Sequence, residues 1–201
     1  MAISERSRHS VTRLTGAGMT KRIARHIVLI GMMGAGKTAV GTELARRLRV
    51  PFTDSDAEIE AAAAMSISEI FARDGESFFR DRESQVLTRL LAGRPSVIST
   101  GGGAWLRAEN RAAIAARGIS VWLNCSPEVL WHRVRQRSTR PLLKTADPKG
   151  TLLRLLAERS PIYAQAEVEF LSQPGDSIEA STDRLIAQLR AADPTLIEDK
   201  A

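Results

Sequence analysis

One short stretch of the chain combines glycines with a lysine and a threonine at a spacing that suits phosphate chemistry. Residues 31–38 read GMMGAGKT and fit the pattern G-x-x-x-x-G-K-[ST], whose glycines let successive backbone N–H groups surround phosphate oxygens. Lys37 can reach the β- and γ-phosphates of a nucleoside triphosphate, and the hydroxyl of Thr38 can ligate Mg²⁺. An apolar run precedes the loop and an amphipathic helical pattern follows it, as this mechanism requires. We therefore predict a nucleoside-triphosphate site here.

Two further groups of residues follow later apolar runs. Asp54 and Asp56 come just after one run, and Gly101, Gly102 and Gly103 come directly after another. Open parallel sheets bind ligands at the carboxyl ends of their strands, so these groups are expected at one edge. The carboxylates suit Mg²⁺ and an acceptor hydroxyl, but they equally suit capping of the next helix. The glycines indicate either a tight turn or the close approach of a ligand or another backbone segment.

Three arginines are candidates for anion binding, although each also fits an ordinary solvated surface. They are Arg80, Arg140 and Arg159. Arg140 has the strongest position, because it borders a segment containing two prolines and a glycine that can close like a lid over about 138–150. An arginine there can bring positive charge to a transferring phosphoryl group.

The elements that must position these residues follow from alternating apolar and helical patterns. Short apolar runs predict strands at 27–30, 51–53, 96–100, 119–123 and 166–171. Helical patterns predict helices near 37–49, 55–64, 66–73, 76–92, 106–116, 150–159 and 178–192, and one beginning at the Ser126 cap. Residues 141–150 are typical of a loop. This alternation predicts an α/β fold of three layers, α/β/α, with a central parallel sheet of about five strands and a mobile lid.

Charge is distributed unevenly along the 201 residues, whose formal net charge is +6. Residues 1–25 hold six basic side chains and one acid, which leaves 23 basic and 22 acidic side chains in the rest. The body therefore lacks support for the basic face of a nucleic-acid-binding protein. We expect residues 1–25 to be a basic, disordered extension, with a targeting role as the alternative, and residues 26–201 to be a single domain.

Composition excludes several other classes of protein. No apolar run approaches the roughly 20 residues of a membrane span. The single cysteine, Cys125, excludes a disulfide framework and fits a reducing compartment, and we expect it to be a buried small hydrophobe. The three histidines are too scattered to indicate a metal site. We expect a cytoplasmic protein that acts as a monomer.

Six motifs together resemble those of the bacterial type of shikimate kinase, in order and with similar spacing. They are GMMGAGKT (31–38), DSD (54–56), FFRDRE (78–83), TGGG (100–103), RPLL (140–143) and ERSPIY (158–163). The resemblance covers about residues 25–193 and implies a P-loop kinase fold with ATP and Mg²⁺ as cofactors. It implies transfer of the γ-phosphoryl group of ATP to the 3-hydroxyl of shikimate, giving shikimate 3-phosphate and ADP in chorismate and aromatic amino acid biosynthesis.

The resemblance also implies roles for individual residues. For nucleotide binding it implies residues of the phosphate loop, namely Gly34, Ala35, Gly36, Lys37, Thr38 and Ala39. It also implies two arginines, Arg133, which stacks on adenine, and the lid arginine Arg140. For the metal it implies Thr38 and Asp54, the latter acting through water. For substrate it implies Asp56, Gly101, Gly102, Gly103, and the arginines Arg80 and Arg159, which grip a carboxylate. The implied catalytic residues are Lys37, Asp56 and Arg140, with Asp56 as base or positioner.

Two other classes stay open as alternatives. Another P-loop small-molecule kinase, of the gluconate or nucleoside-monophosphate type, shares the loop and the lid but is not expected to combine DSD, TGGG and ERSPIY. A non-catalytic nucleotide-binding domain predicts the loss of a phosphate- or acceptor-binding residue, and none is missing. The expected partner is the small molecule shikimate, with neither nucleic acid nor membrane.

Overall fold

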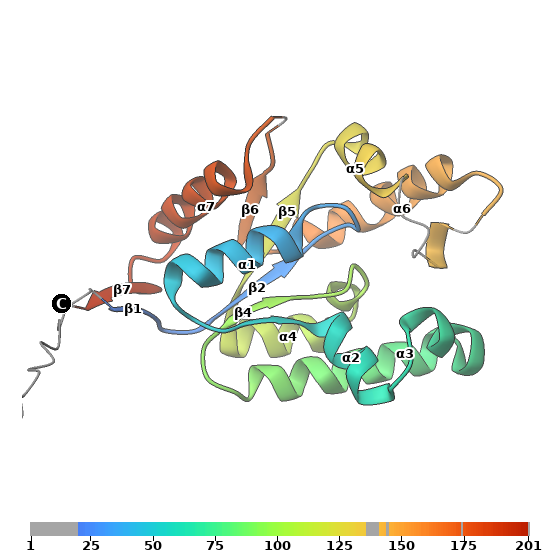
Figure 1. Ribbon diagram of the computed structural model, residues 1–201, viewed down its shortest axis with the longest axis horizontal. Helices are drawn as coiled ribbons and strands as arrows, with labels where there is room; N and C mark the ends of the chain where they lie inside the picture. Colours follow the sequence, from blue (N-terminus) through green and yellow to red (C-terminus); the bar gives the residue numbers. More distant parts are fainter. Residues whose placement is uncertain (1–19, 136–140, 144, 174, 201) are drawn as a thin grey trace, which may run out of the picture.

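Five parallel strands form the central sheet, in the order β3-β4-β2-β5-β6 (Figure 1). The structure is a computed structural model that describes residues 20–200 except 136–140, 144 and 174. The strands are β1 (Thr20–Ile23), β2 (His26–Ile30), β3 (Phe52–Asp54), β4 (Val97–Ser99), β5 (Gly118–Asn124), β6 (Val168–Leu171) and β7 (Ile197–Lys200). The helices are α1 (Lys37–Leu48), α2 (Ser55–Ala63), α3 (Ile67–Leu91), α4 (Ala108–Arg117), α5 (Pro127–Val134), α6 (Pro148–Tyr163) and α7 (Ile178–Ala192), with short 3₁₀ helices η1 (Ala104–Leu106) and η2 (Pro141–Leu143).

Helices cover both faces of the sheet and so form the outer two layers. Helices α1 and α7 pack together on one face, and α3 and α4 pack together on the other (Figure 1). In the middle of the sheet, Ile27 of β2 is in register with Val97 of β4 and Ile119 of β5, and all three are buried. Strands that are buried on both faces need continuous apolar runs. These strands are therefore predictable from the sequence although apolar and polar residues do not alternate along them. The predicted three-layer α/β/α architecture with a five-stranded parallel sheet is confirmed.

The parallel arrangement brings the predicted motifs to one edge. Strands β2, β3 and β4 lie side by side in the sheet and run in the same direction. The phosphate loop begins at Gly31 directly after β2, and Asp54 is the last residue of β3. The glycine turn follows β4 at Thr100. Sheet topology alone therefore joins three segments that are about 20 to 70 residues apart in the sequence.

Helix α3 differs from the expected pair of helices because it continues across a break. Gly75 has φ 81° and ψ 173°, which is not helical, and the chain resumes its helix immediately afterwards. The helix begins with a capping box in which Ser66 and Glu69 bond each other's backbone N–H groups. The predicted boundary between 73 and 76 thus corresponds to a kink, which redirects the segment that carries Arg80.

Helix α6 is longer than the expected helix over 150–159. The side chain of Asp147 accepts from the N–H of Gly150 at 2.9 Å, and Pro148 begins the helix, so it starts inside the segment expected to be a loop. At the other end it continues through Pro161 to the buried Tyr163. Tertiary packing therefore overrides the usual effect of a proline, and the extra turn brings Tyr163 to the site.

The first strand lies before His26, the residue at which the sequence pattern placed the start of the domain. Residues Thr20–Ile23 form β1, which pairs antiparallel with β7 near the end of the chain (Figure 1). Ile23 is 2% exposed and pairs with Ile197. A four-residue strand whose partner lies more than 170 residues away has no local signal, so neither strand was predicted.

Two expectations from composition concern residues that the structure describes. Cys125 is buried, and its thiol lies 3.5 Å from the carbonyl oxygen of Ala35 in the phosphate loop. Among the described residues, no helix combines the length and the apolar character that crossing a bilayer would require.

Candidate active site

The loop after β2 turns sharply and leads into α1. Gly34 and Gly36 have φ of 83° and 94°, a left-handed conformation that other residues rarely adopt. A Cβ atom at Gly34 would also lie 2.7 Å from Cγ1 of Val134, so the space is closed to a side chain. Gly36 is the N-cap of α1 and has no side chain to occupy the N–H groups of the first turn. The loop therefore offers an anion both backbone donors and the positive end of a helix.

Lys37 places a positive charge across this loop. Its Nζ donates to the carbonyl oxygens of Gly31 at 2.9 Å and Met32 at 3.0 Å. Both acceptors lie at the start of the same loop, so the side chain folds back over it. This position suits a cation that contacts the outer phosphates of a nucleotide held by the loop.

Asp54 joins the phosphate loop to the end of β3. Its Oδ2 accepts from the hydroxyl of Thr38 at 2.9 Å, and its Oδ1 accepts from the N–H of Asp56 at 3.1 Å. The second bond caps α2, so the helix-cap interpretation is correct for this carboxylate. One residue thus serves both as cap and as partner of the loop hydroxyl. Thr38 and Asp54 present adjacent oxygen atoms at this position, and oxygen atoms are the ligands that Mg²⁺ prefers, so the pair fits that ion.

Two carboxylates converge on the first glycine of the turn after β4. A Cβ atom at Gly101 would lie 2.6 Å from Oδ1 of Asp56 and 2.6 Å from Oε1 of Glu83. Glu83 is fully buried in α3, and this burial raises the pKa of its carboxyl group. The expected close approach at this glycine is therefore made by side chains of the protein itself. Any larger residue at Gly101 would displace both carboxylates.

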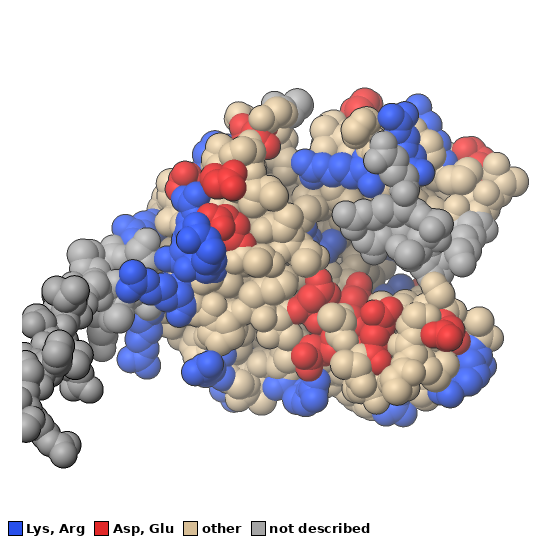
Figure 2. Space-filling view, in the orientation of Figure 1, with Lys and Arg blue, Asp and Glu red and all other residues tan. Residues whose placement is uncertain are grey.

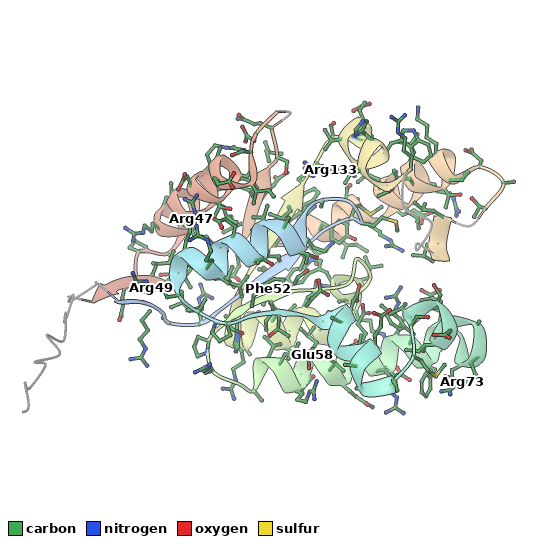
Figure 3. All side chains as sticks on the ribbon, in the orientation of Figure 1. Arg47, Arg49, Phe52, Glu58, Arg73 and Arg133 are labelled. Atoms are coloured by element: carbon green, nitrogen blue, oxygen red, sulfur yellow. The ribbon has the colours of Figure 1, made fainter. Side chains whose placement is uncertain are left out.

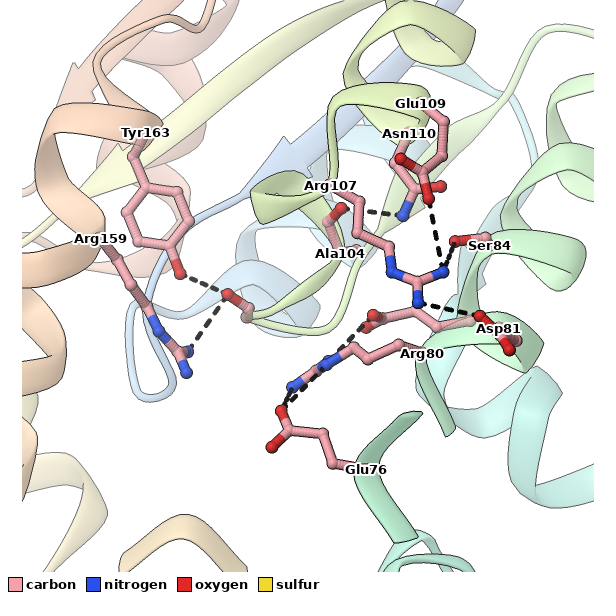
Figure 4. A network of polar contacts seen from close by, with 12 residues as sticks. Glu76, Arg80, Asp81, Ser84, Ala104, Arg107, Glu109, Asn110, Arg159 and Tyr163 are labelled. Carbon is pink, nitrogen blue, oxygen red and sulfur yellow. Dashed lines mark hydrogen bonds and ion pairs between the residues drawn. The ribbon is translucent and has the colours of Figure 1, made fainter. Parts of the chain in front are cut away.

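Arg80 lies on α3 within a network of acids and aromatic rings rather than on a solvated face. Its Nη1 pairs with Oε2 of Glu83 at 2.9 Å and its Nη2 with Oε1 of Glu76 at 3.0 Å (Figure 4). The guanidinium carbon lies 5.1 Å from the ring centroid of Phe79, a cation–π geometry. The guanidinium also fills the space over Gly103, where a Cβ atom would collide with it. These contacts orient the arginine toward the glycine turn.

Arg159 approaches the same turn from α6. It is 8% exposed, and its Nη1 donates to the carbonyl oxygen of Gly102 at 3.4 Å (Figure 4). The hydroxyl of Tyr163 donates to that oxygen at 2.5 Å. Gly102 itself packs against the phosphate loop, since a Cβ atom there would lie 3.4 Å from the carbonyl oxygen of Gly31. The glycine turn is thus the point where α3, α6 and the phosphate loop meet.

Arg133 connects α5 to the phosphate loop. Its Nη1 donates to the carbonyl oxygens of Gly34 at 3.1 Å and Ala35 at 3.3 Å, and Figure 3 shows the side chain directed from α5 toward the loop. Asp176 and Ser177, on the segment between β6 and α7, also line the site. An exposed guanidinium plane beside the loop suits contact with a nucleotide base.

One predicted site residue cannot be placed. Arg140 lies outside the described residues, as do residues 138, 139 and 144 of the predicted lid. Of the remaining lid residues, 141–143 form η2, and 148–150 belong to α6. Leu142 of η2 faces the site.

A single cavity of about 1720 Å³ brings the predicted residues together. Every described residue of the predicted set lines it, namely Gly34, Ala35, Gly36, Lys37, Thr38, Ala39, Asp54, Asp56, Arg80, Gly101, Gly102, Gly103, Arg133 and Arg159. Figure 2 shows acidic side chains gathered around α2 on one side of the hollow, opposite basic side chains over α5. The volume and lining of the cavity suit two ligands, one at the phosphate-binding groups and one at the arginines beside the glycine turn.

Sequence reasoning missed three residues that contact the arginines or the glycine turn of this site. Glu83 and Tyr163 fall inside motifs that were recognised, but a lone glutamate or tyrosine carries no signal for contact with a glycine backbone. The third is Glu76, whose helical spacing of four residues before Arg80 could have indicated the ion pair.

This fold and site define a P-loop phosphotransferase that holds a small acceptor beside the nucleotide. The family model described as shikimate kinase matches residues 33–190. A shikimate kinase of Ruegeria pomeroyi is 58% identical over 172 residues, 86% of this chain and 88% of that protein. One from Cereibacter sphaeroides is 50% identical over 192 residues, 96% and 94% of the two chains. A solved structure, shikimate kinase from Acinetobacter baumannii in complex with shikimate, is 39% identical with TM-score 0.77, covering 83% of this chain and 92% of that one. The chain belongs to the shikimate kinase family.

Proposed function

We propose that this protein transfers the γ-phosphoryl group of ATP to the 3-hydroxyl of shikimate, giving shikimate 3-phosphate and ADP. The observation that carries the proposal is the convergence of Arg80 and Arg159 on the glycine turn, beside Asp56 and in the same cavity as the phosphate loop. Two arginines from different helices provide the planar, paired donors that a carboxylate needs. Membership of the family supports the same acceptor.

At the acceptor end, the paired arginines hold the carboxylate of shikimate and so fix the orientation of its ring. Asp56 binds the acceptor hydroxyl, directs its oxygen toward the γ-phosphate and accepts its proton as the new bond forms. The glycine turn supplies close backbone contact without obstructing side chains. These interactions convert a bimolecular encounter into a reaction between fixed partners, which supplies much of the rate in phosphoryl transfer.

At the nucleotide end, the loop N–H groups and Lys37 hold and neutralise the phosphates. Thr38 would ligate Mg²⁺ and Asp54 would hold it through water, and the ion would supply positive charge that offsets the charge of the phosphates. Arg133 stacks on adenine, beside the segment that carries Asp176. Arg140 reaches the phosphates when the lid closes, which also excludes water from the reaction.

The chain is proposed to act as a monomer in the cytoplasm. What supports a monomer is that the described chain by itself brings the phosphate loop, the glycine turn and both described arginines of the acceptor site to one cavity. The one cysteine is buried and free, which suits a reducing compartment. Light scattering of the purified protein tests the monomeric state, for which a constant mass of 21.9 kDa is expected.

The test is ADP release from ATP and Mg²⁺ with shikimate, gluconate, a nucleoside monophosphate or no acceptor. Stimulation by shikimate alone is expected, and ³¹P NMR of the product should show a phosphate ester at the 3-position. The Lys37→Ala variant should lose nearly all turnover, because phosphate charge is no longer neutralised. Stimulation by another acceptor instead would overturn the choice of substrate. Nucleotide binding with no turnover for any acceptor would favour a non-catalytic domain.

A further inference from the structure

The carbonyl oxygen of Gly102 accepts from two side chains of α6 that are one helical turn apart. The hydroxyl of Tyr163 lies 2.5 Å from this oxygen, and Nη1 of Arg159 lies 3.4 Å from it. Both donors are buried, and Figure 4 shows them directed at the same atom. A carbonyl oxygen has two lone pairs, so it can accept both bonds at once. The tyrosine makes the short bond, and the arginine makes the long one.

We propose that Tyr163 is a positioning residue for the acceptor carboxylate: its hydroxyl keeps the Gly102 carbonyl satisfied, so that the guanidinium of Arg159 can leave that oxygen for the substrate. This inference rests on the proposed function, because it needs a carboxylate that Arg159 binds. Without the hydroxyl, the half-buried carbonyl has Arg159 as its remaining donor among the hydrogen bonds of the described residues. The substrate would then compete with the protein's own backbone for one guanidinium.

The surroundings of Tyr163 suit a fixed donor. Its side chain is fully buried, and its ring centroid lies 5.9 Å from that of Trp122. Burial raises the pKa of the phenol above its ordinary 10.0, so the hydroxyl is protonated at neutral pH. The hydroxyl also lies 3.8 Å from the sulfur atom of Met32, a weak acceptor, and within hydrogen-bonding reach of the guanidinium of Arg159. The bond from the hydroxyl to the carbonyl oxygen of Gly102 therefore does not depend on Arg159 and remains when Arg159 moves.

The first experiment compares Tyr163→Phe with a matched control. Trp105→Phe also removes one hydrogen bond between the segment after β4 and α6, because Nε1 of Trp105 donates to the carbonyl oxygen of Ile162 at 2.9 Å. Tyr163→Phe should raise KM for shikimate about tenfold, the size expected when one buried hydrogen bond is lost, and leave KM for ATP within about twofold. Trp105→Phe should lower stability and leave both KM values within about twofold. Equal effects on KM for shikimate in the two variants would overturn the proposal, since that is what a purely structural role produces.

The second experiment tests whether Tyr163 acts through Arg159. In an Arg159→Met background, Tyr163→Phe should change the Kd for shikimate, measured by calorimetry without nucleotide, by less than about twofold. A further tenfold loss in that background would mean that the tyrosine acts independently of the arginine, contrary to the proposal. Wild-type protein without any shikimate-dependent ADP release would instead refute the proposed function, so the two failures are distinguishable.

A third readout leaves the hydroxyl in place. Tyr163 is the only tyrosine in the 201 residues, so biosynthetic incorporation of 3-fluorotyrosine gives a protein with one ¹⁹F resonance. Saturating shikimate should shift this resonance, because Arg159 leaves the shared oxygen, and the shift should disappear in Arg159→Met protein saturated with shikimate. A resonance that does not move in the otherwise wild-type protein contradicts the proposal even if Tyr163→Phe fails to fold.

Discussion

Arg80 is held by two carboxylates that differ in burial. Glu83 is fully buried beside the glycine turn, whereas the side chain of Glu76 is 58% exposed. Both bonds are close to 3 Å, so distance does not distinguish the two partners. Their environments do, because a buried ion pair is screened less by water and costs more when it is broken. The inner carboxylate therefore determines where the guanidinium lies.

The two glutamates consequently make a matched pair for mutagenesis. Glu83→Gln should lower the free energy of unfolding by about 1–3 kcal/mol and raise KM for shikimate several-fold, because the buried charge of Arg80 loses its partner. Glu76→Gln should change stability by no more than about 0.5 kcal/mol, as expected of an exposed pair. Urea denaturation and steady-state kinetics measure both effects. Equal stability losses in the two variants would show that burial does not govern this network.

A buried histidine, His26, makes the stability of the fold depend on pH. His26 is 2% exposed, and its Nδ1 accepts from the N–H of Ser96 at 3.2 Å, a bond that a protonated Nδ1 cannot accept. Desolvation lowers the pKa of His26 below its ordinary 6.5. The unfolded chain then binds the proton more readily, so stability is fully present above pH 6.5 and falls as the pH drops toward the folded-state pKa. Urea unfolding between pH 7.5 and 5.5 should show this decline. This decline in stability should be smaller in the His26→Gln variant. It should persist in the His132→Gln variant, because His132 is exposed in the wild-type protein.

At the scale of elements, the kink at Gly75 sets the direction of the segment that carries Glu76 and Arg80. Its φ of 81° is unfavourable for other residues, although no atom outside the adjacent residues lies within 4 Å of a Cβ placed there. Gly75→Ala should cost about 1 kcal/mol or more through backbone strain alone and raise KM for shikimate. Gly175→Ala is the control, because that glycine has φ 86° and equally open surroundings near the nucleotide end. An increase in KM for shikimate in both variants would show that the effect is general loss of stability.

The elements also show what a sequence can predict and what it cannot. The phosphate loop, the ends of β3 and β4, and α7 over 178–192 depend on local patterns; the loop and α7 lie where they are predicted, and the two strand ends lie within one residue of the prediction. The extension of α6 through Pro161 depends on the burial of Tyr163, which is a tertiary contact. The same holds for Glu83, whose importance comes from the space over Gly101 rather than from its neighbours in sequence. Local chemistry is visible in a sequence, whereas contacts between distant segments are visible only through the fold.

At the scale of the whole molecule, the two ends of the described chain are joined. Strand β1 pairs with β7, and the N–H of Ala24 donates to the carbonyl oxygen of Leu196 at 3.0 Å. Next to it, Arg25 pairs with Glu167 at 3.2 Å and with Asp193 at 3.1 Å. These contacts lie at the amino ends of the parallel strands, opposite the cavity (Figure 1). They therefore belong to stability rather than to the reaction.

Two truncations separate the basic extension from this terminal pairing. Deleting residues 2–19 should leave KM and kcat for both substrates within about twofold, because the predicted chemistry lies in the domain. Deleting residues 2–24 also removes β1 and exposes the partners of Ile23, a side chain worth about 1.5–3 kcal/mol when buried. For a domain of this size that loss lowers Tm by about 5 °C, with kinetics below the transition unchanged. Equal Tm values for the two truncations would mean that β1 contributes nothing to stability. A large loss of kcat in the folded shorter truncation would mean that the extension takes part in the reaction.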